Sequence, residues 1–456
     1  MTRSNRPFLW GAATSSYQIE GAIHADGRGP SIWDTFCAQD GTIADGTSGD
    51  GACDHYHRWP EDLDLLQWMG VDAYRFSIAW PRIQPTGRGP ANEAGLDFYS
   101  KLVDGLLERG IEPAVTLYHW DLPQALEDEG GWRNRDIVDR FVEYADIVSR
   151  RLGDRVGLWI THNEPWCVAH LGHATGEQAP GMKDVGTSLA VAHHVLLSHG
   201  AAVPVIRRNV PGASVGITVN LCPAFPASPS VADARATMLF DGFFNRWYLD
   251  PLYGRGYPDD KVADYRASGD LPDGPLPFVQ DGDLETIAAA TDFLGINYYS
   301  RAIIRDESAA DNEPVTLKST GVVTDMGWEV HADSLRLLLH RVAEDYSPAA
   351  IYITENGAAY PTEPDADGRV RDVERQAYLE SHVDAVHAAR SEGVPVDGYF
   401  AWSLLDNFEW AFGYEKRFGL IHVDYETQKR TPKDSAHWYR ERIADDRTLA
   451  RSTEAS

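Results

Sequence analysis

The sequence is poor in cysteine and in basic residues, and it lacks a long apolar run. Its 456 residues include four cysteines and no CxxC pair, which gives no support to a structural zinc site or a thioredoxin-like redox motif. Free thiols are compatible with a reducing cytosol. The first residues lack the apolar core of a signal peptide, and no run approaches the ~20 apolar residues that span a bilayer. We therefore expect a soluble, cytoplasmic protein without a membrane partner.

Acidic residues outnumber basic ones. The chain has 41 Lys and Arg against 69 Asp and Glu, a formal net charge of −28, and such a surface repels phosphate backbones and anionic lipid. We therefore expect no nucleic-acid partner. No GxGxxG follows a strand, and GxxxxGK[ST] is absent. The histidines form no metal-ligand pattern such as HExxH, so a metal site is not expected.

What the sequence does contain is a repeated unit. A helical segment ends near a glycine, a short apolar run follows, and that run ends in polar or aromatic residues. Helical spacing is clear over residues 95–110, 134–152 and 375–392, and the strand candidates are 8–12, 74–78, 113–117, 156–160, 215–219, 293–296, 351–354 and 396–401. Eight alternating units predict an α/β fold, a (β/α)8 TIM barrel with long βα loops that forms one catalytic domain over residues 1–456. The stretches 303–320 and 361–372 are expected to be long loops, and residues 447–456 a frayed tail.

In such a barrel the active site lies at the carboxyl ends of the strands. The residues at or just after these ends are polar or aromatic and suit a polyol ligand: Gln18, Arg75, His119, Asn163, Glu164, Asn220, Asn297, Glu355 and Trp402. So many suitable side chains on one rim indicate a carbohydrate site.

Two glutamates directly follow apolar strands, Glu164 in THNEP and Glu355 in ITENG. Glycoside hydrolysis needs two carboxyl groups beside the scissile bond, one protonated and one ionised. A single glutamate at a strand end more often forms a structural ion pair, but the two together favour catalysis. Arg75 near Glu355 would depress its pKa, or it could pair with another buried carboxylate. Tyr299 could donate a hydrogen bond to Glu355 or simply form a wall.

Tryptophan is abundant, with 14 residues. Indole rings stack on the apolar faces of sugars, but they also fill the layer between helices and barrel. We assign Trp402 and Trp410, both in WSLLDNFEW, to sugar binding, with Glu409 beside them to clamp two hydroxyls. The four tryptophans assigned to the packing layer are Trp33, Trp59, Trp68 and Trp159.

Taken together, these motifs resemble glycoside hydrolase family 1, the β-glucosidase family. The resemblance covers nearly the whole chain and is carried by FLWGAATSSYQIEG, YRFSIAWPRIQP, LYHWDLPQAL, THNEP, FLGINYYSR, ITENG and WSLLDNFEWAFGYEKRFGLIHVDY. It implies a retaining mechanism with Glu164 as acid/base and Glu355 as nucleophile, and no cofactor. The residues implied to bind substrate are Gln18, His119, Trp120, Asn163, Trp402, Glu409, Trp410 and Phe418. Arg75, Asn297 and Tyr299 are implied to support the nucleophile, and Trp166 and Trp328 to form walls of the leaving-group site.

The resemblance also narrows the activity. Glu164 is retained where plant thioglucosidases of the family have Gln, and the Glu409–Trp410 pair favours an unphosphorylated sugar. His162 departs from the usual apolar residue and is expected to point away from Glu164. The implied reaction is hydrolysis of terminal non-reducing β-D-glucosyl residues from cello-oligosaccharides and aryl or alkyl β-glucosides, with a role in cellulose degradation. A sugar-binding protein without catalysis and a transglycosidase stay as alternatives. Galactose and fucose stay as candidate glycones, and both a monomer and a homo-oligomer fit the sequence.

Overall fold

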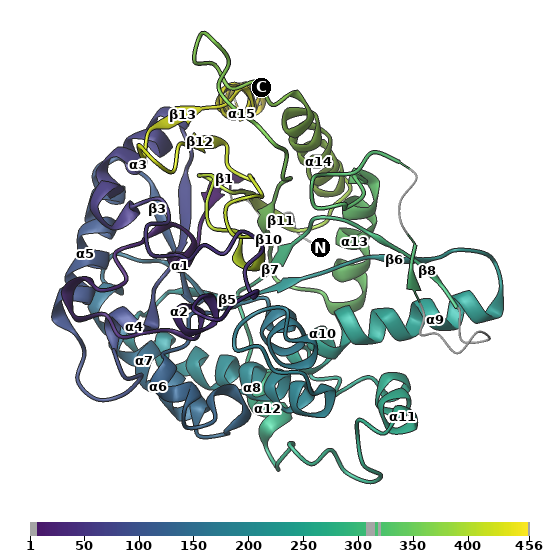
Figure 1. Ribbon diagram of the computed structural model, residues 1–456. Coiled ribbons are helices and arrows are strands. Elements are labelled where there is room, and N and C mark those ends of the chain that lie inside the picture. The colour runs from purple at the N-terminus through teal and green to yellow at the C-terminus, as the bar shows by residue number, and fades with distance from the viewer. Residues whose placement is uncertain (1–6, 307–314, 318–320, 455–456) are drawn as a thin grey trace.

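Eight parallel strands close into a barrel, around which the helices are arranged (Figure 1). The computed structural model describes residues 7–306, 315–317 and 321–454. Around the barrel the strand order is β1, β11, β10, β7, β5, β4, β3 and β2. The bounds are β1 Leu9–Ala13, β2 Ala73–Ser77, β3 Glu112–Tyr118, β4 Leu158–Asn163, β5 Ser214–Asn220, β7 Phe293–Asn297, β10 Ile351–Asn356 and β11 Val396–Trp402. The (β/α)8 prediction is confirmed.

The helices that cover the barrel alternate with its strands along the chain. Their bounds are α3 His55–Met69, α5 Glu93–Glu108, α7 Ile137–Leu152, α8 Val185–Asn209, α13 Ala332–Tyr346, α14 Val373–Ser391 and α15 Asp434–Glu454. In α5, Leu96, Tyr99, Val103 and Leu106 are all buried, so the apolar stripe read from the sequence is the face that packs inward. The connection from β5 to β7 contains further helices, α9 Val231–Asp241, α10 Trp247–Leu252, α11 Asp259–Ser268 and α12 Asp283–Ile287.

The longest helix, α8, bears on the expectation about membranes. Among the helices of the described residues it alone is long and apolar enough to cross a bilayer, by length and composition. The sequence prediction that no segment approaches this criterion is therefore corrected. However, 78% of its most apolar window is buried inside the fold, as expected for a core helix of a barrel.

Short elements at the strand ends build the rim of the barrel. They comprise α1 Ser16–Ile19, α2 Ile32–Cys37, α4 Trp80–Ile83, α6 Gln124–Glu127, η1 Ala25–Gly27, η2 Gly131–Arg133, the π-helical segments η3 Cys167–Thr175 and η4 Gly242–Arg246, η6 Trp410–Phe412, and the β12 Ile421–Val423 and β13 Arg430–Pro432 hairpin. These segments carry much of the candidate site.

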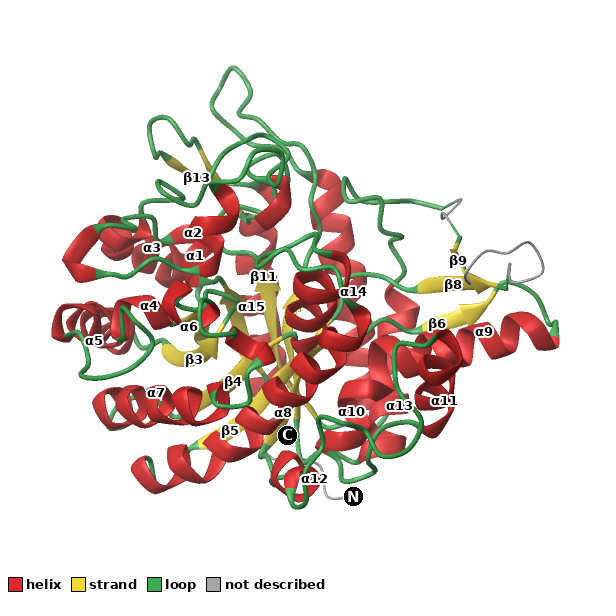
Figure 2. Ribbon diagram, turned by 60° about the horizontal axis from the view of Figure 1, so that its bottom comes forward, coloured by secondary structure: helices red, strands yellow, loops and turns green. Residues whose placement is uncertain are grey.

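One of the two stretches predicted to be long loops, 303–320, contains regular structure. Over residues 302–316, β8 Ala302–Arg305 pairs with both β6 Ala224–Pro226 and β9 Val315–Thr316 in a separate three-stranded sheet next to α9 (Figure 2). The loop prediction for this stretch is therefore partly wrong, because Ile304 is buried against Ala236 of α9. Residues 307–314 and 318–320 lie outside the described part. The stretch 361–372 is a loop, as predicted.

The carboxyl-terminal segment is helical beyond the point where fraying was predicted. Helix α15 continues through Arg447 to Glu454, and residues 455–456 lie outside the described residues. The Arg447 guanidinium donates to the carbonyl oxygen of Gly70 at 2.8 Å and also to the Asp72 carboxylate. This anchor explains why the helix does not end at residue 446.

Candidate active site

The polar residues at the strand ends meet at one end of the barrel. Arg75 lies in β2, His119 directly follows β3, Glu164 directly follows β4, Asn297 ends β7, and Glu355 lies near the end of β10. All five side chains are buried. Because the strands of the barrel are parallel, their carboxyl ends share one rim, and the five predicted site residues are brought together there.

Both oxygens of Glu355 accept hydrogen bonds. Arg75 Nη1 donates to Oε1 at 2.6 Å and Tyr299 Oη donates to Oε2 at 2.6 Å. Arg75 is itself held by Thr116 Oγ1 at 3.1 Å and by the carbonyl oxygen of Thr354 at 3.0 Å. Charge-assisted bonds of this length fix the carboxylate in one orientation.

Glu164 leaves the strand through an unusual backbone conformation. Its φ is 49°, in the left-handed region, which costs a non-glycine residue roughly 1–2 kcal/mol. The backbone N–H of Glu164 donates to the carbonyl oxygen of Thr218 at 2.9 Å. Its side chain accepts from Asn297 Nδ2 at 2.7 Å and from the Cys167 thiol at 3.0 Å. Strain held in place by such bonds is typical of functional positions.

A chain of hydrogen bonds connects the two carboxyl groups. Asn297 Nδ2 donates to Glu164 Oε1 and, at 3.1 Å, to Asn163 Oδ1. Asn163 Oδ1 also accepts from Arg75 Nη2 at 2.6 Å, and Arg75 Nη1 donates to Glu355. Thr354 Oγ1 donates to Asn297 Oδ1 at 2.7 Å, which fixes which way the amide points. Glu164 and Glu355 therefore face the same small polar space.

The two carboxyl groups differ in their electrostatic surroundings. Burial and, next, the charge of Glu355 raise the pKa of Glu164 to about 7. Burial also raises the pKa of Glu355, while Arg75 and Tyr299 act to lower it. Arg75 acts to lower the pKa of Glu355, as predicted. The net pKa is nevertheless raised, contrary to the prediction, because the effect of burial is larger than that of Arg75. Since the charge of Glu355 adds to the effect of burial on the pKa of Glu164, Glu355 ionises first and Glu164 keeps its proton near neutral pH.

The motif glycine after Glu355 has a steric cause. A Cβ on Gly357 would lie 1.7 Å from the carbonyl oxygen of Trp402, so only glycine fits between β10 and the end of β11. The close approach brings the strand that carries Glu355 against Trp402. This steric constraint explains the glycine of the ITENG motif.

A second polar group lies on the loop after β11. Gln18 Nε2 donates to Asn407 Oδ1 at 3.0 Å, to the Phe408 carbonyl at 2.9 Å and to Glu409 Oε2 at 3.3 Å. Burial, followed by the charges of Glu355 and Glu164, raises the pKa of Glu409 to about 8. Glu409 therefore lies within electrostatic reach of Glu164 and Glu355.

Aromatic rings form one side of this space. The His119 ring lies nearly parallel to those of Trp402 and Trp410, with centroids 6.0 and 5.9 Å away. Trp120 lies 4.6 Å from Trp410. Trp33 lies 4.5 Å from Trp410, so its assignment to the helix–barrel layer is wrong: it supports Trp410 from behind.

The hydrogen-bond network also sets the tautomer of His119. Asn163 Oδ1 accepts from Arg75 Nη2 at 2.6 Å and from Asn297, so Asn163 Nδ2 is the atom that faces His119 Nε2 at 3.1 Å. Burial, and then the charge of Arg75, hold the pKa of His119 well below its usual range. The neutral ring therefore accepts at Nε2 and carries its proton on Nδ1, which can donate to a hydroxyl.

The comparisons with known proteins agree with this geometry. Residues 3–448 match the family described as glycosyl hydrolase family 1. The chain belongs to glycosyl hydrolase family 1. The chain is similar to beta-glucosidase A of Acetivibrio thermocellus, 46% identical over 441 residues, with 96% of this chain and 97% of that protein covered. It is also similar to beta-glucosidase A of Thermotoga maritima, 47% identical over 433 residues, with 95% and 96% covered. The solved structure of a Thermotoga maritima beta-glucosidase in complex with glucoimidazole superposes with a TM-score of 0.92 at 46% identity, with 97% of this chain and 99% of that chain covered.

Trp166 and Trp328, the residues predicted to form walls of the leaving-group site, each pack against other aromatic rings. Half-buried Trp166, two residues after Glu164, lies 4.3 Å from the ring of Phe244. Trp328 lies 5.3 Å from Tyr299 and 6.2 Å from Phe418. The two predicted wall residues therefore lie near different carboxyl groups. Trp166 follows the strand that leads to Glu164, and Trp328 packs against Tyr299, which contacts Glu355.

Two buried polar atoms near Glu164 have no hydrogen-bond partner within the described residues. They are Trp166 Nε1, a donor, and Asn220 Oδ1, an acceptor. Buried polar groups without partners are rare and call for an explanation. A ligand hydroxyl near the acid/base position would satisfy either of them.

Sequence reasoning missed Cys167 and Asn407. Cys167 is buried and lies three residues after Glu164, one helical turn away in the π-helical segment η3. That i, i+3 spacing was the available signal. Asn407 lies inside the motif already quoted, but nothing in its neighbours indicated that it would bind Gln18. His162, in contrast, points outward as predicted, bonded to Ser198 of α8 at 2.8 Å.

Proposed function

We propose that this glycosyl hydrolase is a retaining β-glucosidase in which Glu355 is the nucleophile and Glu164 the general acid/base. The observation that carries the proposal is the chain of hydrogen bonds through Asn297, Asn163 and Arg75 that joins two buried carboxyl groups whose surroundings separate their pKa values. Paired carboxyl groups held in different protonation states are what glycoside cleavage requires. Each has the partners that its role needs: two donors hold Glu355, and a pKa of about 7 keeps a proton on Glu164.

In the first step a carboxylate oxygen of Glu355 attacks the anomeric carbon. The bond from that carbon to the aglycone oxygen breaks, and the proton of Glu164 passes to the departing oxygen. The product is a glycosyl ester on Glu355. Because the ester carries no charge, the largest electrostatic cause of the raised pKa of Glu164 is removed, and Glu164 stays ionised.

In the second step Glu164 takes a proton from water, and the water oxygen attacks the same carbon. The ester bond breaks and restores the Glu355 carboxylate. Two inversions give net retention, and this route needs carboxyl groups about 5–5.5 Å apart. The connection of the two carboxyl groups through Asn297, Asn163 and Arg75 is compatible with that spacing.

The substrate proposal rests on the two halves of the site. Glu409, Gln18 and the Trp402–Trp410 pair offer polar clamps and indole faces to one terminal sugar. The similarity to beta-glucosidases favours β-D-glucose there. The Trp166 and Trp328 walls suit either a sugar ring or an aryl group, so cello-oligosaccharides and aryl or alkyl β-glucosides are the proposed substrates, with a role in cellulose breakdown.

The test assigns each glutamate its own role. Glu355→Ala should lower kcat by more than about 10⁴-fold for every β-glucoside. Glu164→Ala should lower it by about 10²–10⁴-fold for poor leaving groups and much less for dinitrophenyl glucoside, whose leaving group needs no proton. Azide should rescue Glu355→Ala to give the α-glucosyl azide and Glu164→Ala to give the β-anomer, because they use opposite faces of the sugar.

A matched control is Glu127→Gln. Glu127 is a buried glutamate bonded to Arg133 at 2.7 Å, away from the network of Asn297. The Glu127→Gln variant should keep near-normal turnover. Near-normal hydrolysis by Glu355→Ala, or azide products with the anomers exchanged, would overturn the assignment.

A further inference from the structure

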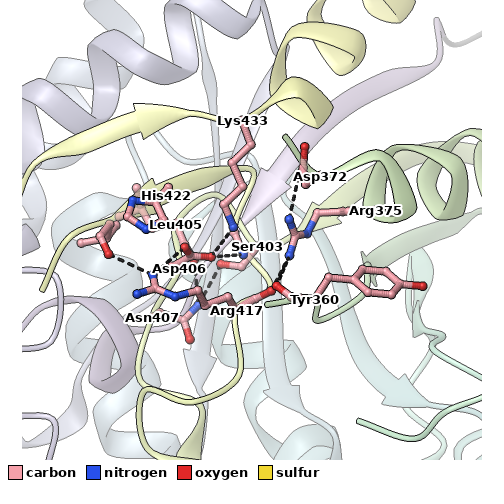
Figure 3. Close-up of polar contacts among 12 residues, drawn as sticks. Tyr360, Asp372, Arg375, Ser403, Leu405, Asp406, Asn407, Arg417, His422 and Lys433 are labelled. Atoms are coloured by element: carbon pink, nitrogen blue, oxygen red, sulfur yellow. Dashed lines mark hydrogen bonds and ion pairs between the residues drawn. The ribbon is translucent and has the colours of Figure 1, made fainter. Parts of the chain in front are cut away.

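A buried ion-pair cluster is built around Asp406 of the loop that follows β11 (Figure 3). Asp406, in this loop, and Lys433, directly after β13, are both fully buried, with Nζ 2.7 Å from Oδ1. Arg417 Nη1 donates to the other oxygen of Asp406 at 2.9 Å. One carboxylate therefore receives two cations that come from different parts of the chain.

The same residue joins the two ends of the loop, which form its neck. The backbone N–H of Gly419 donates to Asp406 Oδ1 at 2.9 Å, and the backbone N–H of Asp406 donates to the Ile421 carbonyl at 2.9 Å. A Cβ on Gly419 would lie 2.0 Å from the Asp406 nitrogen, so the two ends touch backbone to backbone. Residues 406–419 are thus tied together at Asp406.

The loop closed in this way carries the residues proposed to bind the sugar. Asn407, next to Asp406, accepts from Gln18 and donates to Ser403 Oγ at 3.1 Å. Glu409 and Trp410 follow two and three residues later. The position of the clamp is therefore set through the chain by the position of Asp406.

A charged cluster is an unusual choice for this task. Replacing a buried ion pair by apolar residues is often neutral or stabilising, so a hydrophobic neck would hold the loop as firmly. What the carboxylate adds is direction, because the backbone N–H of Gly419 and the two side-chain cations approach it along fixed lines. Arg375, held by Asp372 at 2.6 Å, adds a further cation beside it and donates to the Arg417 carbonyl.

We propose that Asp406, held between Lys433 and Arg417, is a positioning residue that sets the glycone selectivity of the enzyme. It acts through Glu409 and Trp410, whose placement decides which hydroxyl pattern is accepted. The inference rests on the proposed β-glucosidase function. It separates two selectivities: the choice among sugar epimers depends on this loop, whereas the choice among leaving groups depends on the Trp166 and Trp328 walls.

The experiment compares Asp406→Asn with the natural protein on three substrates, a nitrophenyl glucoside, the matching galactoside and a methylumbelliferyl glucoside. The amide keeps the size of the side chain but removes its charge and replaces one acceptor oxygen by an NH2 group, which faces one of the two cations. We expect kcat/KM for the glucosides to fall by about 10–100-fold and the glucoside-to-galactoside ratio to fall several-fold. The ratio between the two glucosides should stay within about twofold, since the aglycone walls are untouched.

Asp283→Asn is the matched control. Asp283 is a buried carboxylate that accepts from His193 and from the backbone N–H of Gln280 at 2.9 and 2.7 Å and also pairs with Arg135, yet it touches no part of the loop. Its variant should lower Tm and leave both substrate ratios unchanged. Lys433→Met is a second test that does not depend on Asp406→Asn folding, because Arg417 still neutralises Asp406. It should shift the epimer ratio in the same direction by a smaller factor.

Unchanged epimer ratios in active Asp406→Asn or Lys433→Met would overturn the inference, as would an equal change in the leaving-group ratio. The first result would mean that the cluster only stabilises the fold, and the second that its effect on the site is not specific to the sugar-binding loop. Failure of the proposed function is a different result, since the natural protein would then hydrolyse none of the β-glucosides.

Discussion

Three glutamates of one site are given different properties by their neighbours. Glu355 has an arginine and a tyrosine on its two oxygens, Glu164 has an amide and a thiol, and Glu409 is contacted by the amide of Gln18. Burial raises the pKa of all three, and the charge of Glu355 raises the other two further, to about 7 and about 8. Their order of ionisation therefore begins at Glu355.

This order predicts the pH dependence of kcat/KM and a specific effect of the thiol. In the free enzyme the alkaline limb should fall near pH 7, where Glu164 loses its proton. The Cys167 thiol donates to Glu164 and stabilises its ionised form, so Cys167→Ala should raise that pKa. Because a thiol is a weak donor, we expect the limb to move up by about 0.5–1 pH unit, measured as kcat/KM across pH.

Cys222→Ala is the control for that experiment. Cys222 is also a free cysteine, but its contacts are with the Asn245 region beside the separate sheet rather than with Glu164. Its variant should leave the limb in place. An unchanged or lower limb in Cys167→Ala would show that the thiol does not act as a donor to Glu164.

At the residue scale the sequence located the site but not its electrostatics. Glu164 and Glu355 were predictable because each follows an apolar strand, and a parallel barrel brings strand ends together. The net pKa shift of Glu355 was not predictable, because it depends on burial, which the arginine beside it does not reveal. Trp33 was misassigned for a related reason: helix α2 places it behind Trp410, and spacing along the chain carries no such information.

At the scale of elements, strands were predicted to within one to three residues at either end, since buried runs bounded by glycine and polar residues are a strong signal. The largest miss was the sheet of β6, β8 and β9. Its strands are short and two lie in an acidic stretch, so only their packing against α9 stabilises them. The helical course of α15 past Arg447 was missed because the anchoring partners lie some 375 residues away in the chain.

The interface of β4 with α7 and α8 gives a prediction about the stability of the fold. His162 stacks on Phe141 with centroids 4.3 Å apart and bonds to Ser198, but its buried Nδ1 has no partner among the described residues. Ser198 keeps its bond to the Val195 carbonyl without it. His162→Phe should therefore leave the free energy of unfolding unchanged or raise it by up to about 2 kcal/mol, with kcat/KM within about twofold.

Denaturant unfolding at two pH values checks this. The pKa of His162 lies well below its usual range in the folded state, so below pH 6.5 the unfolded chain binds a proton that the folded chain does not. The gain from Phe should thus be larger at about pH 5 than at about pH 7.5. His193→Phe, which removes bonds to both Tyr257 and Asp283 at 2.9 Å, should instead be destabilising. A several-fold loss of kcat/KM in His162→Phe would mean that the outward face of β4 contributes to catalysis.

At the scale of the whole molecule, histidines make up much of the buried polar interior. Ten of the 16 have a pKa lowered in the folded protein, mainly by burial: His119, His162, His170, His173, His193, His194, His199, His382, His387 and His422. Six carboxyl groups have a raised pKa: Asp121, Glu127, Glu164, Asp250, Glu355 and Glu409. The two sets act on stability with opposite sign as pH changes.

Between about pH 7 and pH 4.5 the histidines should decide the outcome. A neutral buried histidine leaves the unfolded chain with one more bound proton, so stability falls as pH falls below 6.5, whereas a protonated buried carboxyl group has the reverse effect. Ten groups against six predict a net loss on acidification, and each excess proton is worth about 1.4 kcal/mol per pH unit. Chemical denaturation should give a free energy of unfolding at least about 3 kcal/mol lower at pH 5 than at pH 7.5. The measurement belongs in about 0.5 M salt, where screening reduces the repulsion of the acidic surface, because protonating a chain of charge −28 would otherwise stabilise it. Stability that rises towards pH 5 under these conditions would show that the buried carboxyl groups, and not the histidines, dominate the proton balance of folding.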